Sequence, residues 1–174
     1  MSKVVYLNKP SKEIVLDLIN LQSTVPITLD DVIFETPVPI VAASVPLINR
    51  NTRIRLTGTD NQRFTEEKTV YYNRLNIQTL FGTSQVGIPE IPVDFSDALR
   101  LLNFNYGLAI QSDEVYPQEL VNGNTTIRIK ESLVYEPESE ITLVSNTDLV
   151  WFENAVDRYW FYVNTTLPNA IGIV

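Results

Sequence analysis

The sequence predicts an α+β protein made of two similar small units, each with a helix packed on antiparallel strands. Three observations lead to this prediction. Two segments have the apolar spacing of amphipathic helices, and several others alternate apolar and polar residues as half-buried strands do. The third observation is that part of the first half of the chain returns in the second half. With 174 residues, the chain is long enough for two such units.

The repetition relates residues 10–32 to residues 93–115, which are identical at six of 23 positions. Ordinary composition gives roughly one or two such matches. The identities keep a stripe of leucines, an asparagine at the helix end and an acidic turn: Leu16/Leu99, Leu18/Leu101, Asn20/Asn103, Ile27/Ile110, Asp30/Asp113 and Val32/Val115. The alternative is that two amphipathic helices resemble each other because both bury leucine and isoleucine. We predict a first unit over 1–81, a linker over 82–92 and a second unit over 93–174.

In the first unit, residues 3–7 are β-prone and are expected to form an edge strand. Pro10 and Ser11 open a helix, and the Ser11 side chain is available to cap it. Residues 51–57 alternate as a strand, and residues 69–75 are expected to pair with them in antiparallel fashion.

In the second unit, either Asp94 or Ser96 can cap a helix that Gly107 stops. Strands are then expected over 126–130 and 140–144, the first of them after a tight turn. The two units therefore share one order of elements, a helix followed by an antiparallel pair of strands.

The composition limits the chemistry that the chain can perform. Cysteine and histidine are absent, which excludes disulfides, thiolate metal sites and a Ser-His-Asp triad. The formal net charge of −8 argues against nucleic acid as a partner. No run of about 18 apolar residues occurs, so no membrane span and no membrane partner are expected. We expect no catalytic residue, no cofactor and no metal.

Pairs of acidic residues are the remaining candidates for chemistry. Asp30-Asp31 and Asp113-Glu114 occupy matching places in the two copies, and we interpret them as caps of short helical turns. Calcium binding or acid catalysis is the alternative. Glu136, Glu138 and Glu140 alternate and are expected to form one solvated side of a strand, with a divalent ion as the alternative.

Two apolar segments are hard to bury within a chain this short, and both are predicted interfaces. The first is a proline-rich arm over 36–49, with Pro37, Pro39, Ile40, Val41 and Val45 as candidates. The second is the C-terminal tail, where a final aromatic strand is expected over 158–163. Its candidates are Trp151, Phe152, Tyr159, Trp160 and Tyr162. These aromatic side chains could instead close the core of the second unit.

The first copy also resembles a repeat of virion structural proteins in large tailed bacteriophages. The resemblance lies in Leu18-Ile19-Asn20, in residues 27–32, in residues 51–56 and in residues 70–75. The second copy matches more loosely and lacks the Tyr-Tyr-Asn-Arg-Leu ending. Such a family supplies no catalytic residues to this chain.

The resemblance implies a non-enzymatic component of the tail, baseplate, neck or capsid. Such a protein would be assembled in the host cytoplasm and would contact other virion proteins, with further copies of itself as a second option. The alternative function is a carbohydrate- or surface-binding module that stacks sugars on Trp151, Tyr159 or Trp160. An enzyme that uses carboxylates alone is the third hypothesis.

Overall fold

The computed structural model describes residues 5–40, 50–59, 66–88, 92, 94–118, 125–145 and 172–173. The helical elements there are α1 (Ser11–Asn20), α2 (Ile77–Phe81), α3 (Phe95–Tyr106) and the 3-10 turn η1 (Ser112–Glu114). The strands are β1 (Val32–Phe34), β2 (Val38–Pro39), β3 (Thr52–Gly58), β4 (Lys68–Tyr72), β5 (Gln85–Ile88), β6 (Thr125–Arg128), β7 (Glu140–Ser145) and β8 (Gly172–Ile173). The predicted α+β class is confirmed.

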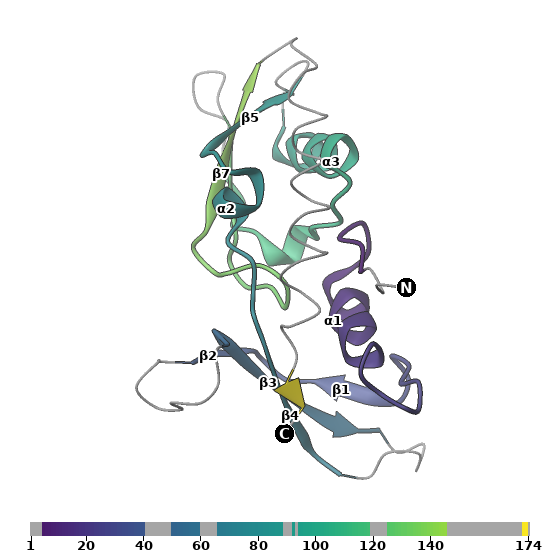
Figure 1. The fold of residues 1–174 in the computed structure, drawn as a ribbon. Helices are drawn as coiled ribbons and strands as arrows, with labels where there is room; N and C mark the ends of the chain where they lie inside the picture. The colour runs from purple at the N-terminus through teal and green to yellow at the C-terminus, as the bar shows by residue number, and fades with distance from the viewer. Residues whose placement is uncertain are drawn as a thin grey trace.

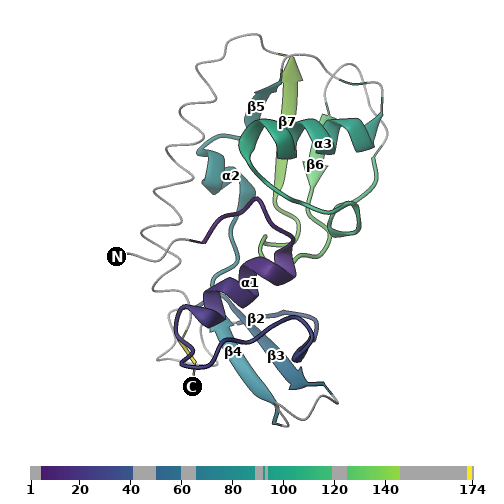
Figure 2. The same cartoon turned by 90° about the vertical axis from the view of Figure 1, so that its right-hand side faces the viewer.

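The strands form two sheets that lie at opposite ends of the molecule (Figure 1). Sheet 1 has the order β1-β3-β4-β8, with β2 also paired to β3, and sheet 2 has the order β5-β7-β6. Helix α1 lies across one face of sheet 1, and α3 lies across one face of sheet 2 (Figure 2). Each sheet therefore has one face covered by a helix.

Sheet 1 is antiparallel, and its central strand β3 alternates between the two faces. Ile54 and Leu56 are buried, whereas Arg53 and Arg55 between them are exposed. The pairing of Ile54 with Val70 places a second apolar side chain on the buried face. The strands predicted over 51–57 and 69–75 thus correspond to β3 and β4.

Sheet 2 is mixed, because β6 and β7 pair in antiparallel fashion while β5 is parallel to β7. Residues 85–88, inside the segment expected to be a linker, form β5 instead. Val86, Gly87 and Ile88 are buried there, which explains why this short run pairs with a sheet and does not remain a connection. The division of the chain into units at this segment stays a prediction.

One continuous core draws on both sheets and on both long helices. Val5 and Leu7 reach this core from the N-terminal segment, with exposed fractions of 3% and 0%. The segment 5–7 forms no strand, so the edge strand expected over 3–7 is wrong for these residues. Their apolar character serves the core and not a sheet edge.

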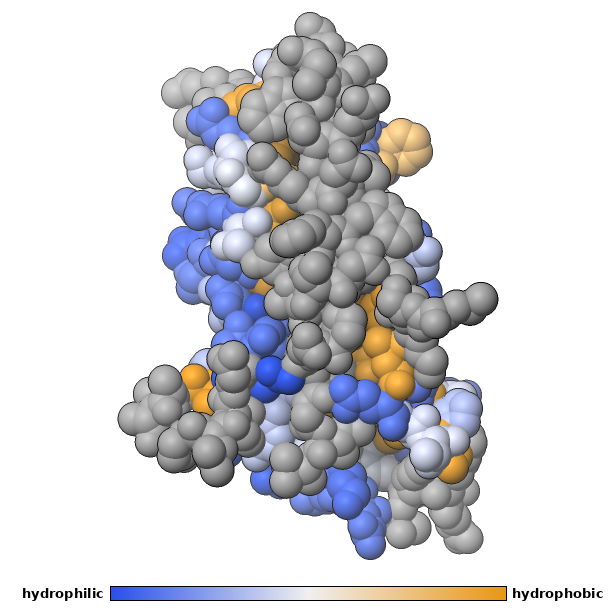
Figure 3. Space-filling view, viewed as in Figure 1, coloured by the Kyte–Doolittle hydropathy of each residue, from blue (hydrophilic) through white to orange (hydrophobic). Residues whose placement is uncertain are grey.

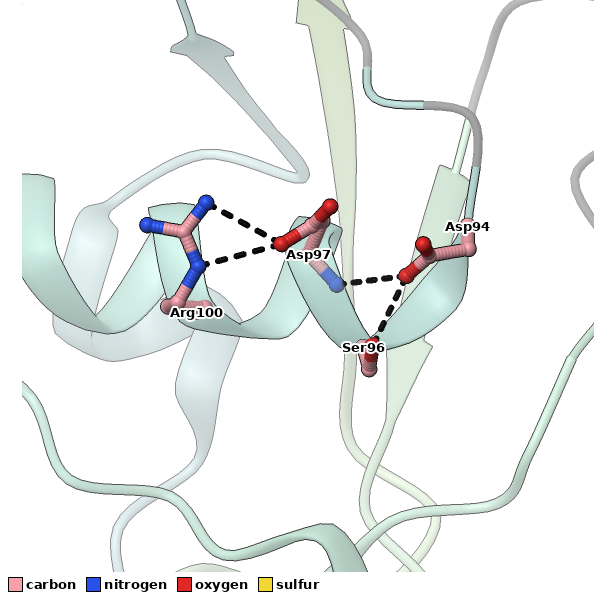
Figure 4. Close-up of polar contacts among 4 residues, drawn as sticks. All are labelled: Asp94, Ser96, Asp97 and Arg100. Atoms are coloured by element: carbon pink, nitrogen blue, oxygen red, sulfur yellow. Dashed lines mark hydrogen bonds and ion pairs between the residues drawn. The ribbon is translucent and has the colours of Figure 1, made fainter.

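Helix α3 has clear signals at both ends. Asp94, and not Ser96, is the cap: its carboxylate accepts from the Asp97 backbone N–H at 2.8 Å and from the Ser96 hydroxyl at 2.7 Å (Figure 4). Arg100 pairs with Asp97 one turn later at 3.0 Å. Gly107 ends the helix with φ +62°, a conformation that favours glycine.

The described part of the chain contains no helix that is both long and apolar enough to cross a membrane. The aromatic strand expected over 158–163 lies outside the described residues. The short strand β8 pairs with β4 at the edge of sheet 1.

Candidate functional site

A groove of about 480 Å³ opens where the first part of the chain meets the second. Five segments form its walls: the start of α1, the turn before β1, the stretch from the end of β1 to β2, the η1 turn, and the loop after β6. The lining residues are Pro10, Ser11, Lys12, Glu13, Leu29, Phe34, Glu35, Thr36, Pro37, Gln111, Asp113, Glu114, Glu131, Ser132 and Leu133.

The buried carboxylate of Glu114 holds three of these walls together. Its Oε1 accepts from the Ser11 hydroxyl at 2.5 Å and from the Ser132 hydroxyl at 2.6 Å. Its Oε2 accepts from the Gln111 backbone N–H at 2.9 Å. The expectation that Ser11 caps α1 is therefore wrong. Helix α1 has Pro10 at its N-cap and no side-chain cap, because the proline side chain carries no acceptor, and the Ser11 hydroxyl donates to Glu114 instead.

The second acid of each predicted pair caps its turn. Asp31 Oδ2 accepts from the Thr28 backbone N–H and from the Thr28 hydroxyl, both at 2.8 Å. Glu114 makes the matching contact with Gln111, which also lies three residues earlier. Among the described residues, no group of three acidic side chains lies close enough to hold a metal ion.

Each long helix carries the same asparagine clamp in its last turn. Asn20 Nδ2 donates to the Ile27 carbonyl at 2.8 Å, and Asn20 Oδ1 accepts from the Ile27 N–H at 2.8 Å. Asn103 makes both contacts with Ile110, at 2.8 and 3.0 Å. The clamp fixes a backbone segment seven residues beyond the asparagine in both places.

A second polar cluster joins segments that flank the two sheets. The Glu136 carboxylate accepts from Asn51 Nδ2 at 2.9 Å and from Asn76 Nδ2 at 3.2 Å. Arg74 is buried and donates to the Thr52 hydroxyl at 3.0 Å and to the Ser132 carbonyl at 3.4 Å. Burial lowers the pKa of the Arg74 guanidinium from its usual value.

Glu136, Glu138 and Glu140 do not share one side of a strand, which corrects the sequence-based expectation. Only Glu140 lies in β7, where it is exposed. Glu136 belongs to the cluster between the sheets, and Glu138 pairs with Arg128. Glu138 also accepts from the Tyr116 hydroxyl at 2.8 Å, and this contact raises the pKa of Tyr116. The loop before β7 lies in a hydrophilic region of the surface (Figure 3).

The face of sheet 1 opposite α1 is the second candidate surface, and we call it the outer face. The register places Ile33 opposite Thr57, and Val38 opposite Arg53, on this face. Ile33 is 56% exposed and Val38 is 43% exposed, although both are apolar. Arg55 lies between the two pairs and faces Glu35 at 3.8 Å.

The residues predicted as interfaces lie in different environments. Pro37 is buried and lines the groove, so it contributes to the fold of this chain. Pro39 is exposed in β2, and Ile40 is half-buried with its N–H donating to the Asn51 carbonyl at 2.8 Å. The other candidates lie outside the described residues: Val41, Val45, Trp151, Phe152, Tyr159, Trp160 and Tyr162.

Sequence reasoning missed the exposed apolar side chains Leu29, Ile33 and Phe104, which are 41%, 56% and 82% exposed. A signal for Leu29 is present in its neighbours. It stands between Thr28 and Asp30 in a capped acidic turn, and such a turn lies at the surface. Phe104 occupies a helix position that matches Leu21 in the first copy, and Leu21 packs against the core.

In comparisons with known proteins, no curated protein and no solved structure matches the chain. A family model described as "Family of unknown function" matches residues 4–148, which is most of the chain and includes sheet 2, strands β1 to β4 of sheet 1 and the groove. The chain therefore belongs to this family of unknown function, DUF7941.

Proposed function

We propose that the chain is a structural protein of a bacteriophage particle, which assembles with other virion proteins and performs no catalysis. The observation that carries the proposal is the outer face of sheet 1. Antiparallel sheets that face water usually carry polar side chains on the solvent side. Here Ile33 and Val38 stand on that side with large exposed fractions.

The edge of sheet 1 beside these residues also suits assembly. Strand β1 has three residues and β2 has two, so both cover only part of β3. Short strands limit uncontrolled pairing between edges, and an apolar face beside them gives a defined place for another chain. Arg53 and Arg55 supply polar groups around the apolar residues, as the rim of an interface does.

We further propose that the chain consists of two copies of one unit. The asparagine clamps of Asn20 and Asn103 and the acidic caps of Asp31 and Glu114 support this origin, since each pair is separated by 83 positions. The place of the protein in a phage particle rests on the resemblance of the first copy to a repeat of phage structural proteins.

Hydroxyl-radical labelling of the protein, free and in purified particles of its source, tests the proposal. We expect mass spectrometry to find the chain in the particles. Ile33 and Val38 should then be labelled several-fold less in the particle than in the free protein. Phe104 is the control, because it is exposed on α3 at the opposite end of the molecule from the outer face. Absence of the chain from the particles, or equal labelling of Ile33 and Val38 in both states, would overturn the proposal.

A variant adds a second readout. The change Ile33→Asp places a charge on the outer face without removing a core side chain, so the protein should fold normally. We expect its incorporation into particles to fall at least several-fold, while Phe104→Asp is incorporated like the original chain. Normal incorporation of both variants would argue against this face.

A further inference from the structure

We propose that the groove between the two parts of the chain binds a basic, extended segment of a partner protein, with an apolar side chain of that segment on the groove floor. This surface is distinct from the outer face of sheet 1. The volume of about 480 Å³ lies within the range of roughly 300–1,000 Å³ that is typical of ligand sites.

The walls of the groove are held in place before any ligand arrives. Ser11, Glu114 and Ser132 link the start of α1, the η1 turn and the loop after β6. The Ser132 hydroxyl also accepts from the backbone N–H groups of Val134 and Tyr135, at 3.1 and 3.2 Å. A site that is already ordered loses little conformational entropy on binding, and this favours affinity.

The floor is apolar and only partly covered by the protein itself. Phe34 and Leu133 are half-buried and pack against the core on one side. Leu29 is 41% exposed, and Pro10, which also lines the groove, is exposed as well. An apolar side chain placed here would cover surface that now faces water, at roughly 25 cal/mol for each Å² removed.

The charges around this floor favour a basic partner. Glu13, Glu35, Asp113 and Glu131 line the groove in addition to the buried Glu114, and Lys12 is the one basic residue of the lining. Glu35 also forms an ion pair with Arg55 on the outer face, so part of its charge is already neutralised. The remaining carboxylates attract lysine and arginine and repel phosphate and other anions.

The same features favour a basic polypeptide segment over a metal ion as the ligand of the groove. The described acidic residues form no cluster that could hold a metal ion, because they are spread along the walls. A chain segment can place several cationic side chains at separate carboxylates and still bury an apolar side chain between them. Recognition of extended segments commonly combines such pockets with charged rims.

Fluorescence anisotropy of the full chain with labelled peptides tests the inference. The probe is a short peptide of alternating lysine and leucine, and the controls are a glutamate–leucine peptide and a lysine–serine peptide. We expect the lysine–leucine peptide to bind, and to bind more weakly as salt is raised. The glutamate–leucine peptide should not bind. Failure of the lysine–leucine peptide to bind at about 1 mM would overturn the inference.

Two variants locate the binding. The double change Glu13→Gln with Asp113→Asn should weaken the lysine–leucine peptide about threefold to tenfold, because each exposed ion pair contributes little. In the Leu29→Asp variant, the lysine–leucine peptide should no longer bind more tightly than the lysine–serine peptide. Glu140→Gln, an exposed acid on β7, is the matched control and should change nothing.

Unchanged binding in both groove variants would overturn the assignment. The assignment would also be overturned if the peptide caused copies of this chain to associate with one another without binding the peptide, which a measurement of the protein's mass in solution would show. Backbone amide shifts of the original chain give a check that needs no variant. They should move at Leu29, Phe34 and Leu133 on peptide addition, and movement confined to other regions would contradict the groove.

Discussion

Glu114 is the residue at which distant parts of the chain meet. Its side chain receives hydrogen bonds from Ser11, 103 positions away, and from Ser132, 18 positions away. A buried carboxylate is costly unless its oxygens are satisfied, and three donors satisfy this one. The residue therefore fixes where α1 begins relative to the second half of the chain.

We expect Glu114→Ala to lower the free energy of unfolding by about 2–4 kcal/mol, because buried hydroxyls of Ser11 and Ser132 lose their acceptor. Glu114→Gln should cost less, since an amide oxygen can still accept from both serines but its NH2 group cannot accept from Gln111. Urea unfolding followed by circular dichroism measures both values. Asp113→Asn, an exposed neighbour, is the control, and an equal loss there would contradict a special role for Glu114.

The asparagine clamps give a second prediction at this scale. Asn20→Ala and Asn103→Ala should each cost about 1–3 kcal/mol, because each removes two hydrogen bonds to a partly buried backbone segment. Thermal or urea unfolding measures the loss, and Asn8→Ala, at an exposed position, should be near neutral. A large loss for one clamp and none for the other would show that the two sites are not equivalent.

Single residues show what the sequence can and cannot tell. The roles of Asp94 and Gly107 follow from local rules, because a cap or a helix stop involves neighbours within a few positions. Ser11 and Pro37 fail the same reasoning. The Ser11 hydroxyl is satisfied by a residue far along the chain, and Pro37 is a buried residue of a groove whose other walls come from distant segments. Neither environment can be predicted from the nearby sequence.

At the scale of elements, α3 is the most self-contained piece of the structure. Asp94 caps it, Gly107 ends it, and Tyr106 ties it to β5 by donating to the Gly87 carbonyl at 2.6 Å. Burial raises the pKa of Tyr106 to about 12. The Phe81 and Tyr106 rings are nearly perpendicular with their centroids 5.0 Å apart, so α2 joins the same contact.

The cap of α3 should make its stability depend on pH. The Asp97 N–H and then the Ser96 hydroxyl donate to Asp94, and this lowers the pKa of the Asp94 carboxyl below 3.8. The contribution of a depressed carboxyl is present above its unfolded pKa and is lost as the pH falls through the folded value. The original chain should therefore be more stable than Asp94→Asn at neutral pH, and the difference should close below about pH 3.8.

Urea unfolding of both proteins over a pH series measures this difference. Glu66→Gln, at an exposed position, is the control for the general effect of acid. A difference between the original chain and Asp94→Asn that stays constant down to the lowest pH would contradict the role of the Asp94 charge.

Strand β5 is an element that the sequence pattern does not reveal. Glycines and prolines surround it, and such residues are typical of turns and linkers. Its four residues carry too little periodicity to be recognised, yet they pair with β7, which lies more than 50 positions later. The strands with alternating residues and near partners, β3 with β4 and β6 with β7, are the ones that the sequence predicts.

At the scale of the molecule, the two sheets share one core. The Tyr72 hydroxyl donates to the Leu133 carbonyl at 2.7 Å, and Leu75 forms a bridge with Tyr135. Burial in this region raises the pKa of the Tyr72 phenol. These contacts join sheet 1 to the segment that leads into sheet 2, so we expect the described part of the chain to unfold as one unit.

Hydrogen exchange with a conservative core change tests this cooperativity. Ile127→Val in sheet 2 should cost about 0.5–1.5 kcal/mol. It should lower the protection of the Ile54 amide in sheet 1 by the same amount. The reverse experiment, Ile54→Val read at Ile127, is the matched control. Protection that falls only in the sheet carrying the change would indicate two independently folding parts.

The contact between Ser11 and Ser132 can form only late in synthesis of the chain. The two residues are separated by 121 positions, which a ribosome covers in on the order of 10 s. Throughout that interval the start of α1 lacks the side chains that close the groove beside it. Helix α1 of a nascent chain therefore lacks these contacts until synthesis has passed Leu133, and a partner that needs the complete groove can bind only after that point.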